Sequence, residues 1–412
     1  MKFNSLLALV LTPLAWAQSP DIAELLSKDP AVQAALAAAR KNEATTLNDQ
    51  AAICEIPAPP FHETVRGLEL KRRFEALGLK NVFIDKVGNV IGTRPGQAAR
   101  PNLVMAAHLD TVFPEGTAVK VTRDGDTLKG PGIGDDCRGL AVLLSTIRSL
   151  DEGKVVTPGT ITFVADVGEE GLGDLRGAKN LFYESLKGQI DQFVSIDGTG
   201  LGIAHIGVGS FRYRVTFQGP GGHSYGAFGM ANPAHALGRA IAKISDFEVP
   251  TNPKTTFNVG RVGGGTSVNA IPYQAWMEVD MRSADPAALK ALDEKFKAAV
   301  QQAVDEENRR WHDKGKIRVS PELVGIRPAG ETSKDSEIVR TALAVSRALG
   351  IAEQLREGST DSNVPMNLHI PAITISGGGV GTGAHSLSEA FDAKDSWVGT
   401  QRAVLLAVAL AR

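Results

Sequence analysis

Short apolar runs alternate with amphipathic segments along most of the chain, and the two patterns predict strands and helices. Runs with almost no polar position, as in strands buried on both faces, occupy residues 102–107, 160–165 and 193–196. Helical spacing of apolar positions predicts helices over residues 21–47, 61–77 and 138–150. Because such helices and strands follow one another in turn, we expect βαβ units and a mostly parallel sheet.

The pattern changes near residue 207. Residues 211–217 alternate apolar and charged positions, which is typical of a half-exposed antiparallel strand. Further helices are expected at 233–246 and 285–302, and further strands at 257–262 and 275–281. The first style then returns, with helices at 336–349 and 397–411 and a strand at 372–376. We therefore predict an α/β domain made of residues 18–206 and 327–412, interrupted by a two-layer α+β domain at 207–326.

The first 17 residues have the features of a signal peptide. Lys2 precedes an apolar run at 6–14, and Ala15-Trp16-Ala17 forms a small-x-small cleavage site. We expect the mature chain to begin at Gln18 and to be periplasmic or secreted, with a retained N-terminal anchor as the alternative. No later apolar stretch of the sequence approaches the length of a transmembrane helix.

Composition narrows the class of partner. The 412 residues are 43% hydrophobic and 22% charged, as in globular proteins. The 44 Lys and Arg residues against 46 Asp and Glu residues leave a formal charge of −2, without the basic excess that favours nucleic acid. Cys54 and Cys137 are the only two cysteines, and a single disulfide and two buried free thiols both remain open.

Histidines and acids follow the predicted strands. The run 102–107 leads into His108-Leu109-Asp110, and residues two apart at a strand end point to the same side. Asp110 can therefore hold one imidazole nitrogen of His108 while the other faces a metal. A hydrogen-bonded pair without a metal would have the same sequence pattern. Asp135 and Asp136 lie in a glycine-rich loop just before a predicted helix, where acids also serve as helix caps.

Paired glutamates follow the second of these strands. Glu169 and Glu170 could be solvated loop charges, but a metal hydrolase needs one carboxylate for the metal and another to take a proton from the attacking water. Asp197 follows the next buried strand, and His385 follows a glycine-rich loop near the end of the chain. Together these residues form a nitrogen and oxygen set that suits Zn²⁺, or Co²⁺ and Mn²⁺ as substitutes. Glu389, four residues after His385, is expected to be a charge on a helix surface, with a supporting role beside the site as the alternative.

In their order and in their residues, these motifs resemble those of the co-catalytic metallopeptidase family. That family contains glutamate carboxypeptidase, acetylornithine deacetylase, succinyl-diaminopimelate desuccinylase, aminoacylase, carnosinase and peptidase T. The resemblance covers nearly all of the chain after the signal segment. It implies a zinc-exopeptidase-like catalytic domain, with the insertion as a lid and dimerisation domain and a homodimer as the assembly.

The resemblance also implies a pair of zinc ions in each chain, held by five side chains. These are His108 and Asp197 for one ion, Glu170 and His385 for the other, and Asp135 as the bridge. Asp110 would orient His108, and Glu169 would act as the general base.

Two segments of the insertion resemble the family's lid motifs. Residues 219–224 are similar to its histidine loop, which implies that His223 reaches an active site, often that of the partner protomer, and stabilises the oxyanion. Asn269 and Arg282 would hold a substrate carboxylate or carbonyl, although a turn residue and a structural ion pair are the plainer interpretations. The expected activity is hydrolysis of short peptides by a carboxypeptidase or an aminopeptidase. Deacylation of N-acyl amino acids and non-catalytic peptide binding on the same scaffold are the alternatives.

Overall fold

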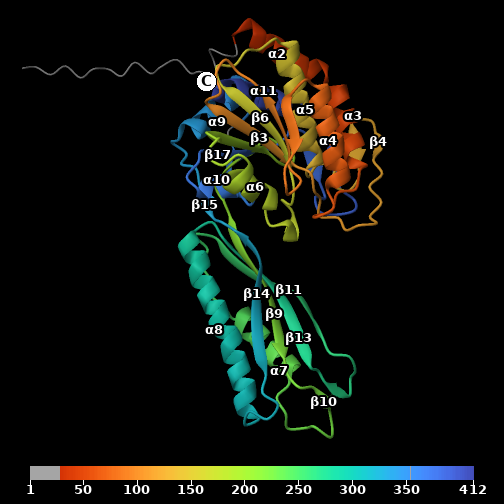
Figure 1. Cartoon of the computed structure of the whole chain (residues 1–412), viewed down its shortest axis with the longest axis vertical. Helices are drawn as coiled ribbons and strands as arrows, with labels where there is room; N and C mark the ends of the chain where they lie inside the picture. Colours follow the sequence, from red (N-terminus) through yellow and green to blue (C-terminus); the bar gives the residue numbers. More distant parts are fainter. Residues whose placement is uncertain (1–27, 353) are drawn as a thin grey trace, which may run out of the picture.

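The protein forms two lobes. The computed structural model describes residues 28–352 and 354–412, so the predicted signal segment lies outside the described residues. Figure 1 shows a larger lobe, in which helices surround a central sheet, and below it an elongated smaller lobe formed by the middle of the chain. None of the helices in the described ranges combines the length and apolar character needed to cross a bilayer.

The larger lobe is built around one mixed sheet with the strand order β1-β2-β6-β3-β7-β17-β8-β15, and β16 pairs with β8. Its strands are β1 (Lys80–Ile84), β2 (Val90–Arg94), β3 (Asn102–His108), β6 (Thr160–Asp166), β7 (Gln192–Ile196), β8 (Ile203–Gly207), β15 (Gly330–Glu331), β16 (Leu355–Gly358) and β17 (Ala372–Ile375). The central strands β6, β3, β7 and β17 are parallel, as predicted, whereas β1 and β2 extend the sheet antiparallel. The carboxyl ends of β3, β6 and β7 therefore lie at one edge of the sheet, and predicted site residues lie at or directly after these strand ends.

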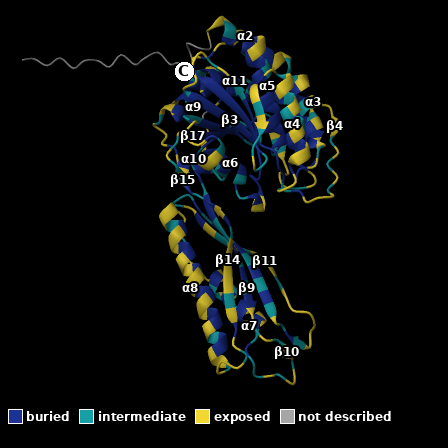
Figure 2. Ribbon diagram, in the orientation of Figure 1, coloured by how far each residue is buried: buried dark blue, intermediate teal, exposed yellow. Residues whose placement is uncertain are grey.

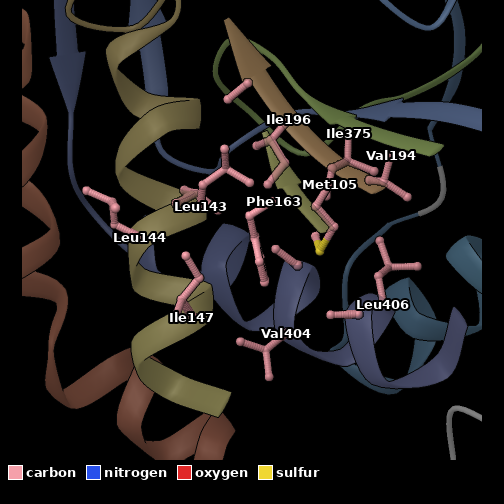
Figure 3. Close-up of a cluster of buried hydrophobic side chains, with 14 of the residues drawn as sticks. Met105, Leu143, Leu144, Ile147, Phe163, Val194, Ile196, Ile375, Val404 and Leu406 are labelled. Carbon is pink, nitrogen blue, oxygen red and sulfur yellow. The ribbon is translucent and has the colours of Figure 1, made fainter. Parts of the chain in front are cut away.

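Helices cover both faces of this sheet. They are α2 (Pro30–Lys41), α3 (Glu43–Cys54), α4 (Thr64–Ala76), α5 (Cys137–Glu152), α6 (Arg176–Asn180), α9 (Glu337–Ala348), α10 (Asn363–Asn367) and α11 (Trp397–Leu410), with a short π-helical turn at Leu181–Ser185. Met105 and Phe163 pack against α5 and α11, as Figure 3 shows, while Val104 packs on the opposite face beside α6 and α10. Because alternate residues of β3 enter two different cores, the strand has no polar position between Asn102 and His108.

The smaller lobe is a two-layer unit. Its antiparallel sheet has the order β11-β13-β9-β14, formed by β9 (Gly209–Gln218), β11 (Thr255–Gly264), β13 (Gln274–Ser283) and β14 (Arg318–Arg327). The helices α7 (Pro233–Ser245) and α8 (Pro286–Arg310) pack against it, and Figure 2 shows the outer face of α8 exposed. Tyr213, Val215 and Phe217 point into this core, which explains the alternation seen in the sequence. The predicted α/β fold with an α+β insertion is thus present, while its exact limits at 207 and 326 stay predictions.

Two small sheets complete the fold. One joins β18 (Val380–Thr382), β19 (Ala390–Asp392), β5 (Thr127–Lys129) and β4 (Thr122–Asp124), and the other pairs β10 (Gly222–His223) with β12 (Ala270–Ile271). Because β19 pairs with β5, the loop that carries His385 is held beside the glycine-rich loop that follows β5. This pairing joins segments more than 250 residues apart and was not predictable from either segment alone.

Candidate metal centre

His108 ends β3 with its ring almost fully buried. Its Nδ1 donates to the backbone oxygen of Asp110 at 2.9 Å, whereas the nearer carboxylate oxygen of Asp110 lies 3.7 Å away. The orienting contact therefore comes from the Asp110 backbone. The Asp110 carboxylate instead accepts hydrogen bonds from the backbone N–H groups of Glu169 at 3.0 Å and Glu170 at 2.8 Å, so it ties the two motifs together.

The Asp135 carboxylate lies between two imidazoles. One of its oxygens is 3.0 Å from Nε2 of His108, and the other is 3.1 Å from Nε2 of His385. Glu170 lies on the other side of His385, with Oε1 at 3.1 Å from the same Nε2. These two carboxylates raise the pKa of His385 to about 10.

Asp136 has a different task from its neighbour. Its side chain accepts from the backbone N–H groups of Gly139 at 3.0 Å, of Gly198 at 3.2 Å and of His108 at 3.2 Å. It thereby caps α5 and holds the strand-end loops after β3 and β7 against the helix. Asp135 is therefore the acid of the pair whose oxygens both face imidazole nitrogens.

Asp197 follows β7 and completes the cluster. Potential ligand atoms of His108, Asp136 and Asp197 lie within 4.8 Å of one another, as do those of His108, Asp135 and Glu170. Burial, together with the charge of Asp135, raises the pKa of Asp197 to about 6. All five side chains predicted as metal ligands thus converge at one edge of the sheet.

The donor set fits divalent cations. Nδ1 of His108 donates to the Asp110 backbone oxygen, so Nε2 is the ring nitrogen that faces the Asp135 carboxylate and could bind an ion. Although burial opposes it, hydrogen bonding to Asp110 and Asp135 raises the pKa of His108 well above its usual value, so the surrounding acids favour a positive charge here. Asp135, Glu170 and Asp197 add negative charge to the same buried space, which a bound cation would offset. A set of imidazole and carboxylate ligands that contains no thiolate suits zinc, cobalt or manganese.

Glu169 lies beside this cluster and is buried. Burial raises the pKa of Glu169 to about 8, although the charge of the nearby Arg327 guanidinium acts in the opposite direction. Arg327, the last residue of β14, places a guanidinium nitrogen 2.8 Å from Oε1 of Glu169 and also binds the Glu169 backbone oxygen. We did not predict this contact, because an arginine at the end of an edge strand gives no sign of its distant partner.

Arginines line the same cleft as the acids. A cavity of about 370 Å³ is lined both by the acids and His385 and by four arginines; its charged lining residues are Asp135, Glu169, Glu170, Asp197, His385, Arg212, Arg282, Arg327 and Arg356. Arg282 and Arg212 share the carboxylate of Asp280 at 2.7 and 3.0 Å, so Arg282 is both a structural ion pair and a cleft residue. The guanidinium groups of these arginines can bind a substrate carboxylate in a bidentate manner.

His223 and Asn269 lie elsewhere. His223 is exposed on β10, and Asn269 accepts a backbone hydrogen bond from Ser224 beside it at 2.9 Å. Figure 1 places β10 at the tip of the smaller lobe, far from the larger sheet. Within one chain the structure does not bring these two residues to the cleft.

Two other expectations are decided by the structure. Glu389 is buried and accepts from the backbone N–H groups of Gly132 at 2.7 Å and Gly134 at 2.8 Å, so the prediction of a helix surface charge was wrong. The chain there forms the β18–β19 pair, which turns Glu389 inward onto the glycine-rich loop. Cys54 and Cys137 are both buried free thiols.

Comparisons with known proteins place the chain in a family. Residues 104–409 match the model of peptidase family M20/M25/M40. The uncharacterised protein YqjE of Bacillus subtilis is 27% identical over 356 residues, which are 82% of this chain and 91% of that protein. Carboxypeptidase G2 of a Pseudomonas species is 31% identical over 223 residues, but the match spans only 50% of this chain and 51% of that enzyme.

Solved structures agree on the fold. The aminopeptidase PepT of Bacillus cereus superposes with a TM-score of 0.72 at 22% identity, over 90% of this chain and 99% of that one. The Bacillus subtilis protein YXEP, described as a dinuclear metal-binding peptidase of the M20 family, superposes with a TM-score of 0.65 at 18% identity, over 90% of this chain and 98% of that one. The chain therefore belongs to peptidase family M20/M25/M40 and is a hydrolase of that family.

Proposed function

We propose that the protein is an exported exopeptidase that hydrolyses amide bonds of short peptides with two divalent metal ions, zinc in the first instance. The observation that carries this proposal is the convergence of five imidazole and carboxylate side chains beside a buried glutamate in one cleft. Carboxypeptidase G2 and PepT, both similar to this chain, are named as peptidases. Export rests on the sequence of residues 1–17.

Five residues would hold the metal ions. His108 and Asp197 would bind one ion, Glu170 and His385 the other, and Asp135 both, since its two oxygens face the two histidines. Bound there, the ions would acidify water and polarise the carbonyl of the scissile amide. The Asp110 backbone holds His108 in the tautomer that leaves Nε2 free for this purpose.

Glu169 is the proposed general base. It would take a proton from the attacking water and pass it to the departing amine, and burial holds its pKa near neutrality, where both transfers are efficient. Arg327 would keep the Glu169 carboxylate in place. Arg282 and Arg212, which line the same cleft, would hold a carboxylate of the substrate.

His223 would act in a homodimer. Its position at the tip of the smaller lobe leaves it without a role in its own cleft, so we propose that it reaches the cleft of the partner protomer and stabilises the oxyanion there. Asn269 would accompany it, because the two residues lie on paired segments.

Deacylation of N-acyl amino acids is the second candidate. Such compounds also carry a carboxylate beside the cleaved amide, so the arginine-lined wall accepts them equally well. Acetylornithine deacetylase of Pectobacterium carotovorum is 25% identical over 71% of this chain.

The test is a metal-reconstituted assay with dipeptides and N-acyl amino acids, with and without chelator. We expect elemental analysis to find two divalent ions per chain, turnover of at least one of the two substrate sets, and loss of both on chelation. Binding of peptides without turnover in fully loaded protein would contradict the proposal and favour a binding protein on a peptidase scaffold.

A further inference from the structure

A second cavity opens beside the proposed metal centre. It measures about 400 Å³ and shares Val112, Glu170 and Gly171 with the arginine-lined cleft. Two loops form the rest of its wall, residues 59–62 before α4 and residues 114–115 after β3, together with Leu172. Apart from His62 and Glu115, the added side chains are proline, phenylalanine and leucine, so this hollow is apolar where the main cleft is charged.

Large apolar side chains stand exposed at this cavity. Phe61 is 59% exposed and Leu172 is 55% exposed, and both line the same hollow. A single exposed apolar side chain is ordinary on a protein surface. Two of them facing one cavity that adjoins a reactive cluster have the character of a ligand subsite, because pockets are lined mainly by apolar groups around a few polar ones.

The Phe61 ring is held in place at a conformational cost. Its backbone has φ +73°, in the left-handed region that bulky residues rarely adopt. Glu63 accepts the Phe61 backbone N–H at 3.1 Å and binds Arg176 at 2.7 Å, while the Arg176 guanidinium lies 4.7 Å from the centre of the Phe61 ring. The surroundings thus fix an unfavourable backbone and an exposed ring together, which is the pattern expected of a binding residue.

The loop that carries Phe61 is anchored to the segment that follows His108. Thr111 donates its backbone N–H to the backbone oxygen of Ala58 at 2.9 Å. The buried Arg66 donates to the backbone oxygens of Leu109 at 2.7 Å and Ile56 at 2.9 Å. The apolar cavity therefore keeps a fixed position relative to the metal ligands, and a ligand would meet a preformed wall.

We propose that this cavity receives the apolar side chain or acyl group on the carbonyl side of the cleaved amide. The inference rests on the proposed function and names its substrate class. In a dipeptide or an N-acyl amino acid the amine half carries the carboxylate. The arginines that could hold this carboxylate line the main cleft and not the adjoining apolar cavity, so that cavity is left for the acyl half. The preferred substrates therefore join a leucine, phenylalanine or similar acyl group to a residue with a free carboxylate.

The experiment compares dipeptides X–Ala in which X is Phe, Leu, Ala, Gly or Ser, using the metal-reconstituted full chain. We expect kcat/KM for Leu–Ala to exceed that for Gly–Ala by about 10- to 100-fold, as pockets that bury a few methylenes discriminate. Leu172→Gln and Phe61→Asn should each reduce this ratio by about tenfold. Asparagine tolerates the left-handed backbone, so the second variant removes the ring without adding strain.

Val156→Gln is the matched control. Val156 is 68% exposed in the loop between α5 and β6, at the end of β6 opposite to Glu169. We expect this variant to keep the wild-type ratio. A flat wild-type series, or an unchanged ratio in both cavity variants, would overturn the inference while leaving the peptidase proposal intact.

Absence of any cleavage would be a failure of the proposed function and not by itself of the cavity. Calorimetric binding of Leu–Ala and Gly–Ala to the same metal-loaded protein then decides. Tighter binding of Leu–Ala that is lost in Leu172→Gln supports the subsite, and equal binding of the two dipeptides overturns it.

Discussion

At the scale of single residues, Glu169 is the side chain whose surroundings most alter its chemistry. An exposed glutamate is a weak base at neutral pH, but burial raises the pKa of Glu169 to about 8. Arg327 keeps the same carboxylate from turning away. A group held in this way can accept and return a proton within one catalytic cycle.

Replacement of Glu169 separates catalysis from metal binding. We expect Glu169→Gln to lower kcat by about 10²- to 10⁴-fold, the range for loss of a general base. The metal content, measured by elemental analysis, should stay at the wild-type level because Glu170 is untouched. Wild-type kcat in the Gln variant would remove Glu169 from the mechanism.

Arg327 is a positioning residue for the Glu169 carboxylate. Arg327→Met should lower kcat by about 10²-fold, since small displacements of a catalytic group have effects of that size. Arg327→Lys should recover part of the loss by restoring a cation. Arg318→Met, at the exposed first residue of the same strand β14, is the control and should leave kcat unchanged. No difference between the Met and Lys variants at 327 would argue against a role through charge.

At the scale of elements, Asp136 links a helix to two strands. Its carboxylate accepts three backbone N–H groups from the segments at His108, Gly139 and Gly198. The helix α5 therefore begins against the edge of the sheet that carries the proposed metal ligands. The Asp136 side chain therefore both caps the helix and holds the strand-end loops of the proposed site together.

Loss of this cap should destabilise the fold more than loss of an isolated cap. We expect Asp136→Ala to lower the free energy of unfolding by about 2 to 4 kcal/mol, because three buried donors lose their acceptor. Asp29→Ala, which removes the exposed cap of α2, should cost only about 1 kcal/mol. Urea unfolding measures both. Asp136→Asn keeps an acceptor oxygen, so its loss of stability should lie between those of Asp136→Ala and Asp29→Ala. This variant should also retain two metal ions, and loss of one ion would make Asp136 a ligand.

Elements buried on two faces were predictable, whereas the edge strand β14 was not. β3 and β6 have continuous apolar runs because helices cover both of their faces. β14 lies at the edge of the smaller sheet with mostly exposed residues and includes Pro321, so its composition resembles a loop. Arg327 was missed for this reason, since its strand was missed with it.

At the scale of the whole molecule, the two lobes keep His223 away from the cleft of its own chain. If the partner protomer supplies it, two inactive variants should complement each other. His223→Ala and His385→Ala should each lower kcat by at least about 10²-fold. After subunit exchange, the mixture should regain part of the activity, because one cleft of each mixed dimer holds both His385 and a partner's intact His223.

The control for this experiment is a mixture of His385→Ala with Glu169→Gln, which lie in the same cleft and should complement far less when His223 acts across the dimer. In every mixed dimer of this control, one cleft lacks His385 and the other lacks Glu169, so no intact cleft forms. Activity of a strictly monomeric preparation, verified by analytical ultracentrifugation, would contradict the role of His223 in trans.

The sequence by itself determined the local chemistry. The apolar runs required buried strands, and the histidines and acids placed directly after them had to lie at the carboxyl edge of a parallel sheet, because parallel strands end on the same side. The change of period near residue 207 likewise required a second type of layer.

Only the tertiary structure decided which distant groups meet. The pairing of β19 with β5 brings His385 to Asp135, the end of β14 brings Arg327 to Glu169, and the β18–β19 turn buries Glu389 under the glycine-rich loop. No local pattern encodes these contacts, because each joins residues that are 158 to 257 positions apart in the sequence. The strained Phe61 and its apolar cavity belong to the same class, since Phe61 lies before α4 whereas Arg176 and Leu172, which contact the ring or line the cavity, follow β6.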